Sequence, residues 1–249
     1  IIGPEDSPYV GGFYMFNGQF PDQYPFYPMT MKTMTQGGGV RKHPNLYTSG
    51  KCCFSFLGTW SGPPWTSCQN PDSVGISMRS VLTNNPITNE PGWEKRNDDK
   101  TKTYEDLIKY FNIRYAVCDV LAKVNGNESP YESFSCFKDK INMHFVDNYE
   151  KGNYKSLLQS IKSYNGRNIS SPVYGFSLKF EIDFVNSEIE RLYKAIKDKV
   201  PDKKCSPSQK ESIIDPKVED VPINSNDDLS DEVSVSSSSS NNSSSSKTK

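Results

Sequence analysis

The spacing of apolar residues changes near residue 100, and this change limits the folds that the chain can adopt. Before that point, an aromatic run at 13–16 follows a glycine pair, and residues 29–33 alternate larger side chains with polar ones, as strands do. Beyond it, apolar residues recur every three or four positions, which is typical of amphipathic helices. We therefore expect an α+β fold in which strands precede helices.

The helical spacing predicts three helices after residue 100. The apolar positions of the three, in order, are Leu107, Phe111, Tyr115, Cys118 and Leu121; then Phe134, Phe137, Ile141 and Phe145; then Leu178, Ile182, Val185, Ile189, Leu192 and Ile196. The first helix should cover about 104–123. Apolar stripes of this kind pack in a core, so no cofactor site is inferred from them.

The segment between the predicted strands, residues 20–28, contains Pro21, Pro25 and Pro28. Proline lacks a ladder donor and fixes φ, so this segment should be a rigid connection. Residues 36–100 are rich in Gly, Pro, Asn and Ser, with one short helix expected at 73–82. A long, structured loop is the interpretation of that region.

Charge and hydropathy exclude several classes of partner. The chain has 249 residues, with 29 Lys+Arg against 30 Asp+Glu, so its balance does not indicate nucleic acid. There is no apolar run of about eighteen residues and no secretory signal, so we expect no membrane association. The expected location is the cytoplasm, and also the nucleus. The Ser- and Asn-rich composition after Pro201 predicts a disordered tail.

The six cysteines are expected to be reduced thiols. They include no Cys-x-x-Cys pair, and the only histidines are His43 and His144, so the usual spacing of a structural zinc site is missing. We expect neither a metal nor an organic cofactor.

Chemistry is available where Asn45 lies eight positions before Cys53. A thiol can form a thioester, and an amide N–H can donate to the oxyanion that develops when the thioester is attacked. The alternative is that Cys52 and Cys53 are small buried apolar residues. A cysteine hydrolase with His43 and Asn45 is disfavoured, since Pro44 restricts how both could turn toward one thiol.

Several linked motifs resemble the ubiquitin-conjugating enzyme family. They are Gly3-Pro4-x-x-Ser7-Pro8-Tyr9-x-Gly11-Gly12, Phe20-Pro21-x-x-Tyr24-Pro25-x-x-Pro28, His43-Pro44-Asn45 and Lys51-x-Cys53-x-Ser55. Two more resemble the Z-type branch of that family: Leu57-Gly58-Thr59-Trp60-Ser61-Gly62-Pro63-x-Trp65 and Asn85-Pro86-x-x-Asn89-Glu90-Pro91-Gly92. The similarity extends to about residue 199.

The resemblance implies the ubiquitin-conjugating (UBC-like) α+β fold, with an antiparallel meander sheet, flanking helices and a helical carboxy-terminal extension. The implied division is a conjugating core at 1–125, a helical extension at 126–200 and a disordered tail at 201–249. The core is expected to be incomplete at its amino terminus, because the first helix and first strand of the family would precede Ile1.

The resemblance also implies roles for individual residues. Cys53 matches the thioester cysteine, whereas Cys52 matches a position that is usually apolar. Asn45 matches the residue credited with stabilising the oxyanion or holding the active loop, and His43 is implied to be structural. Glu90 matches an acidic position near the incoming lysine, where a carboxylate could orient the amine. A solvated loop charge is the equally weighted alternative for Glu90.

The implied partners are ubiquitin or a ubiquitin-like modifier, the ubiquitin-activating enzyme, ubiquitin ligases, and protein substrates that present a lysine. A different class of function stays open, namely a non-catalytic module that binds ubiquitin or a ligase and has merely inherited Cys53.

Overall fold

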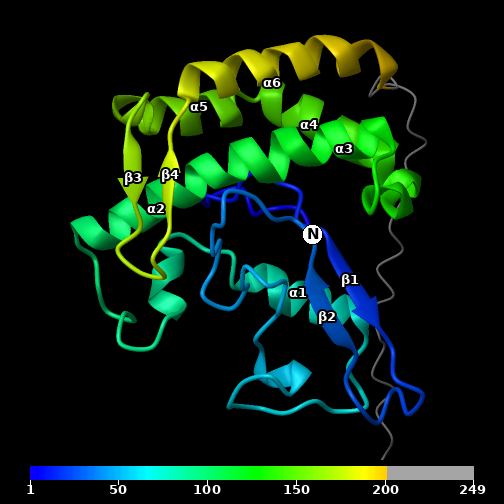
Figure 1. Cartoon of the computed structure of the whole chain (residues 1–249). Coiled ribbons are helices and arrows are strands. Elements are labelled where there is room, and N and C mark those ends of the chain that lie inside the picture. Colours follow the sequence, from blue (N-terminus) through cyan, green and yellow to red (C-terminus); the bar gives the residue numbers. More distant parts are fainter. Residues whose placement is uncertain (201–249) are drawn as a thin grey trace, which may run out of the picture. The chain divides into compact units, whose positions relative to one another are not determined.

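The computed structural model describes residues 1–200, and its amino-terminal segments form a narrow antiparallel meander (Figure 1). Strand β1 (Phe16–Gln19) pairs with β2 (Thr30–Thr33). Single bridges from Ile2 to Phe13 and from Lys32 to Lys51 extend the antiparallel order on both sides of this pair. The predicted meander is therefore present, although only its two central strands are continuous.

The proline-rich connection between β1 and β2 consists of turns, as its composition predicts. It is attached to the loop that follows the cysteines, because the indole N–H of Trp65 donates to the carbonyl oxygen of Pro25 at 2.7 Å. This bond brings the two long loops of the amino-terminal half together.

Six α-helices lie in the described part of the chain. They are α1 (Pro71–Ser80), α2 (Asp99–Phe111), α3 (Val120–Gly126), α4 (Lys138–Glu150), α5 (Asn153–Ser160) and α6 (Ile182–Ile196). Shorter helical turns are η1 (Ser55–Leu57), η2 (Pro86–Asn89), η4 (Tyr131–Phe137), η5 (Lys162–Tyr164) and η6 (Lys197–Lys199), and the π-helical segment η3 covers Asn112–Asp119. No helix among residues 1–200 is both long and apolar enough to cross a membrane.

A continuous helix, formed by α2, η3 and α3, runs through the middle of the described residues (Figure 1). It begins after Asp98, whose carboxylate accepts hydrogen bonds from the amides of Lys100 and Thr101, and ends before Asn127 in the left-handed conformation. The predicted helix at 104–123 is thus confirmed. The helix is longer than predicted because the Asp98 cap starts it one turn earlier.

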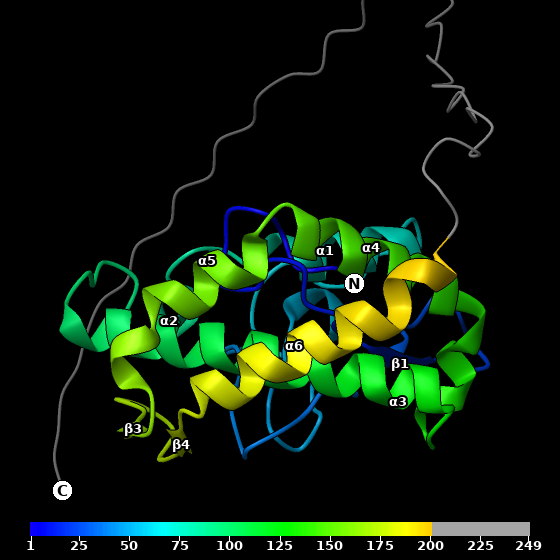
Figure 2. The same cartoon turned by 90° about the horizontal axis from the view of Figure 1, so that it is seen from above.

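The central helix separates two layers. Helices α4, α5 and α6 lie along one side of it, with α6 packed against both η3 and α4 (Figure 2). The strands β1 and β2 and helix α1 lie on the other side (Figure 1). The buried apolar side chains of both layers form one hydrophobic cluster around the central helix.

The third predicted helix is wrong at its start. Leu178 lies in strand β4 (Ser177–Lys179), which pairs with β3 (Asn168–Ser170), and α6 begins only at Ile182. The side chain of Asn165 accepts a hydrogen bond from the Ile182 amide at 2.8 Å and so supplies the cap from a distance. Leu178 is buried, as are the apolar positions of α6, and it lies four residues before Ile182. Its position therefore fits the spacing of a helix although it lies in a strand. Helix α5 was not predicted either.

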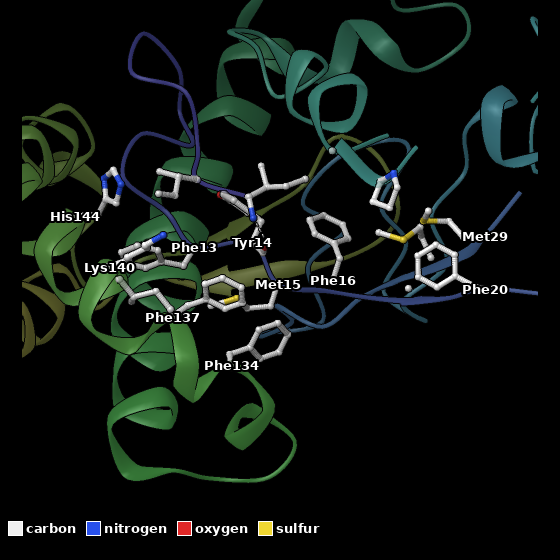
Figure 3. Close-up of a pocket in the computed structure, with 17 residues that line it drawn as sticks. Phe13, Tyr14, Met15, Phe16, Phe20, Met29, Phe134, Phe137, Lys140 and His144 are labelled. Atoms are coloured by element: carbon white, nitrogen blue, oxygen red, sulfur yellow. Dashed lines mark hydrogen bonds between the residues drawn. The ribbon is translucent and has the colours of Figure 1, made fainter. Parts of the chain in front are cut away.

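An apolar cavity of about 500 Å³ lies between the amino-terminal segments and α4 (Figure 3). Phe134 and Phe137 approach it from η4, and Phe13 and Met15 line it from the segment leading into β1. Lys140 and His144 are the basic side chains of its lining. Its lining contains no cysteine, so the chemistry sought in the sequence lies elsewhere.

One cation, Lys42, is buried in the core. Its side chain is fully enclosed, and its Nζ atom has no hydrogen-bond partner among the described residues. Burial lowers the pKa of Lys42 to about 7, an effect that the neighbouring Cys52 partly opposes. An enclosed amine without a partner destabilises the fold.

We expect Lys42→Met to raise the free energy of unfolding by about 1–3 kcal/mol, because it removes an unsatisfied buried amine and keeps a side chain of similar length. The folded pKa of about 7 lies below the usual 10.5, so the unfolded chain binds more protons between these values. Wild-type stability should therefore rise with pH across this window, and the difference from Lys42→Met should narrow. Urea unfolding of both proteins at pH 6.5, 8 and 9.5 measures this difference in the free energy of unfolding. A difference that does not change with pH would contradict the lowered pKa of a buried Lys42 amine.

Candidate active site

The two adjacent cysteines lie in different environments. Cys52 belongs to the hydrophobic cluster, and burial raises the pKa of its thiol to about 11. Cys53 lines a separate cavity of about 310 Å³. Successive side chains of extended backbone point in opposite directions, so one sulfur faces the core and the other the cavity. Of the two thiols, Cys53 is the one placed for chemistry.

The structure brings the three predicted site residues together. Asn45, Cys53 and Glu90 all line this cavity, which also contains Arg41 and Trp60. Among the described residues, no group of three His, Cys, Asp or Glu side chains is arranged to hold a metal ion. The functional groups that line the cavity include a thiol, a guanidinium, two side-chain amides and two carboxylates, the second amide and carboxylate coming from Asn89 and Glu94.

Asn45 holds the cysteine segment in place through reciprocal hydrogen bonds. Its side-chain Nδ2 donates to the carbonyl oxygen of Cys53 at 2.7 Å, and the Cys53 amide donates to the carbonyl oxygen of Asn45 at 2.8 Å. An amide group has two N–H donors, so the second one stays available for an oxyanion beside Cys53. The loop-holding contact is the one that the structure contains.

His43 supports Asn45 from the core. Its Nδ1 accepts a hydrogen bond from the Asn45 amide at 3.1 Å, and its Nε2 lies 3.0 Å from the carbonyl oxygen of Val81. Burial lowers the pKa of His43 to about 3, so the ring is neutral near pH 7. Both ring nitrogens are occupied by backbone groups, which leaves none to serve as the base of a cysteine hydrolase.

Thr59 closes the loop over the cysteine. The Cys53 thiol lies 3.0 Å from the Thr59 carbonyl oxygen, and the Thr59 hydroxyl accepts a hydrogen bond from the Phe54 amide at 2.9 Å. The same hydroxyl lies 2.9 Å from the carbonyl oxygen of Cys52. Cys53 is only 3% exposed, and it lines the cavity.

Glu90 follows the short turn η2 and is half-buried. Its Oε2 accepts a hydrogen bond from the hydroxyl of Tyr174 at 2.5 Å. Nearby, the guanidinium carbon of Arg41 lies 3.8 Å from the ring centroid of Tyr47 and 4.1 Å from that of Tyr174. The carboxylate thus has a protein partner, unlike a freely solvated loop charge.

Sequence reasoning did not identify Thr59, Arg41 or Tyr174 as parts of the site. Thr59 lies inside the motif at 57–65, where its hydroxyl six residues after a thiol is a signal in the sequence. Arg41 precedes the His-Pro-Asn motif, and of the two rings that it contacts, Tyr47 is near in the sequence and Tyr174 is distant. Tyr174 is 84 residues from Glu90, and no local pattern reveals such a pair.

Comparison with known proteins agrees with this arrangement. The family model for the ubiquitin-conjugating enzyme matches residues 1–117. Ubiquitin-conjugating enzyme E2 Z of Xenopus tropicalis is 35% identical over 201 residues, which cover 80% of this chain and 62% of the relative. E2 Z of Danio rerio is 36% identical over 203 residues, which cover 81% of this chain and 60% of the relative. E2 Z of Homo sapiens is 47% identical over 123 residues, which cover 49% of this chain and 35% of the relative.

Residues 1–117, which contain strands β1 and β2 and the cavity with its thiol and amide, match the ubiquitin-conjugating enzyme family. Within the family the chain is similar to the E2 Z proteins. The chain spans less than two thirds of the length of these relatives, at 62% and 60% of the first two.

We expect Thr59→Val to loosen the loop over Cys53, because valine keeps the shape of threonine but cannot hydrogen-bond to the Phe54 amide or the Cys52 carbonyl. The free energy of unfolding should fall by about 1–2 kcal/mol, and Cys53 should react faster with iodoacetamide. Peptide mass spectrometry measures the alkylation rate, with the exposed Cys68 as internal reference.

Thr59→Ser keeps the hydroxyl and is the matched control for this change. Equal Cys53 alkylation rates in the valine variant and the wild type would show that the hydroxyl does not hold the loop closed.

Proposed function

We propose that the chain is a ubiquitin-conjugating enzyme that carries ubiquitin or a ubiquitin-like modifier as a thioester on Cys53 and transfers it to a lysine. The observation that carries this proposal is the single cavity shared by Cys53, Asn45 and Glu90. The similarity to proteins named ubiquitin-conjugating enzyme E2 Z supports it. In this proposal, Glu90 takes part in the transfer of the modifier from Cys53 to the lysine.

In the charging step, the thiolate of Cys53 attacks the thioester carbonyl that links the modifier to the activating enzyme. The new carbon–sulfur bond forms at Cys53, and the thiolate of the activating enzyme leaves. ATP is consumed earlier, by the activating enzyme, so this chain needs no nucleotide site. Cys52 is unsuited to the step, since burial raises the pKa of its thiol to about 11.

In the transfer step, the neutral amine of a lysine attacks the Cys53 thioester. The carbonyl oxygen becomes an oxyanion, to which the second side-chain N–H of Asn45 can donate. The intermediate collapses with loss of the Cys53 thiolate and leaves an amide bond. The proton of the amine passes to Glu90 or to solvent. Neither step requires a metal or an organic cofactor.

The proposed partners follow from this reaction. They are the modifier, its activating enzyme, ubiquitin ligases and protein substrates with an accessible lysine. We also propose that the protein works in the cytoplasm and in the nucleus.

We expect the full-length protein, incubated with ubiquitin, ATP and an activating enzyme, to form an adduct that thiols cleave. Cys52→Ser should retain this adduct, because Cys52 lies in the core and not in the cavity. Cys53→Ser should abolish the adduct or convert it to a thiol-resistant ester, because serine holds the acyl group through oxygen instead of sulfur. Non-reducing gels followed by reduction distinguish these outcomes.

The assay is repeated with several activating enzymes and with ubiquitin-like modifiers. An adduct that depends on Cys52 would overturn the assignment of the carrier. Absence of any adduct, combined with measurable ubiquitin or ligase binding, would favour the non-catalytic module.

A further inference from the structure

The hairpin of β3 and β4 reaches the neighbourhood of the cysteine, although it lies far beyond it in the sequence. Its tip, residues 171–176, is closed by a hydrogen bond from the Ser171 amide to the Phe176 carbonyl oxygen at 2.8 Å. The rings of Tyr174 and Phe176 both pack edge-on against Tyr104 of α2, with centroids 6.0 and 6.4 Å away. The tip is thereby fixed to the central helix.

From this tip, Tyr174 contacts two residues that line the Cys53 cavity. Its hydroxyl donates to Oε2 of Glu90 at 2.5 Å, and its ring centroid lies 4.1 Å from the guanidinium carbon of Arg41. Tyr174 is not itself among the lining residues of that cavity. It can therefore act on the reacting atoms only through Glu90 and Arg41.

The backbone of Tyr174 is strained in the conformation that makes these contacts. Its φ is +65°, and Gly175 follows with φ of +64°. A residue with a Cβ atom in this left-handed region costs about 1–2 kcal/mol, which glycine would avoid. The chain has a tyrosine at this point, where the phenol can reach the carboxylate.

The phenol is suited to serve as a permanent donor. Burial raises the pKa of Tyr174 well above its ordinary value, and the adjacent Glu90 carboxylate raises it further. The hydroxyl therefore stays protonated near neutral pH. It occupies one carboxylate oxygen, Oε2, and leaves Oε1 for another donor.

We propose that Tyr174 is a positioning residue, which holds the Glu90 carboxylate in the orientation that receives the incoming amine. This proposal rests on the proposed function and assigns to the hairpin a part in its second step. An unrestrained glutamate populates several rotamers, and fixing one of them has an entropic cost. If Tyr174 fixes the rotamer before the amine arrives, this cost is not added to the barrier of the transfer step.

Tyr174→Phe tests this role, because it removes the hydroxyl and keeps the ring that packs on Arg41 and Tyr104. The full-length protein is charged with ubiquitin, the activating enzyme is stopped, and discharge to free lysine is followed over time. We expect discharge to be slower by on the order of tenfold, the effect of losing about one hydrogen bond to a charged group.

Two further rates separate positioning from general damage. Charging by the activating enzyme should stay within about twofold, because no amine takes part in it. Discharge to hydroxylamine should also stay within about twofold, since that nucleophile is largely neutral at pH 7 and needs less help to lose a proton. A merely structural defect would lower all three rates together.

Tyr193→Phe is the matched control. The Tyr193 hydroxyl also donates to a glutamate, Oε1 of Glu150 at 3.1 Å, in a contact between α6 and α4. This variant loses the same chemical group from the same type of pair and should discharge lysine at the wild-type rate.

A double-mutant cycle with Glu90→Gln completes the test. If Tyr174 acts through Glu90, adding Tyr174→Phe to Glu90→Gln should slow discharge by less than twofold more. Wild-type discharge by Tyr174→Phe, equal losses with lysine and hydroxylamine, or full additivity with Glu90→Gln would each overturn the positioning role. A wild-type protein that is never charged on Cys53 would instead refute the proposed function.

Discussion

A buried side-chain amide on the central helix holds the amino-terminal segment that leads into β1. Asn112 accepts a hydrogen bond from the Tyr14 hydroxyl at 2.7 Å and donates to the Val10 carbonyl oxygen at 2.9 Å. A Cβ atom on Gly12 would come within 1.9 Å of the Asn112 Oδ1, so the close approach requires glycine there. Because the group is fully enclosed, loss of either partner would leave an unsatisfied polar atom. The segment that leads into β1 is thereby fixed to the central helix.

Two of the site residues that sequence analysis identified, Asn45 and Cys53, have a geometry that is set locally, whereas the contact of Glu90 with Tyr174 spans 84 residues. Asn45 and Cys53 are eight residues apart, and a short turn between them allows their reciprocal hydrogen bonds. Periodicity likewise identifies the central helix, although the Asp98 cap that starts it was not predicted. The start of α6 was predicted wrongly because Leu178 is buried at a helical spacing while lying in a strand. Its boundary depends on Asn165, a cap that no window around Ile182 contains.

The placement of the two cysteines shows how one position decides reactivity. Cys52 faces Lys42 and the core, where burial raises the pKa of the thiol and lowers that of the amine. Cys53, one residue later, lines the cavity with Asn45. The period of two in extended backbone makes this division automatic once the register of the segment is fixed. A shift by one residue would exchange the sulfur that faces the cavity with the one that faces the core.

The bond between Tyr174 and Glu90 also has a consequence for the order in which the protein is made. The two residues are 84 positions apart, and a ribosome that adds about 5–20 residues per second needs roughly 4 to 17 seconds to pass from one to the other. Throughout that interval the nascent chain already contains Cys53, Asn45 and Glu90, yet the tyrosine that contacts the carboxylate has not been synthesised. The contact between Tyr174 and Glu90 can form only after this interval.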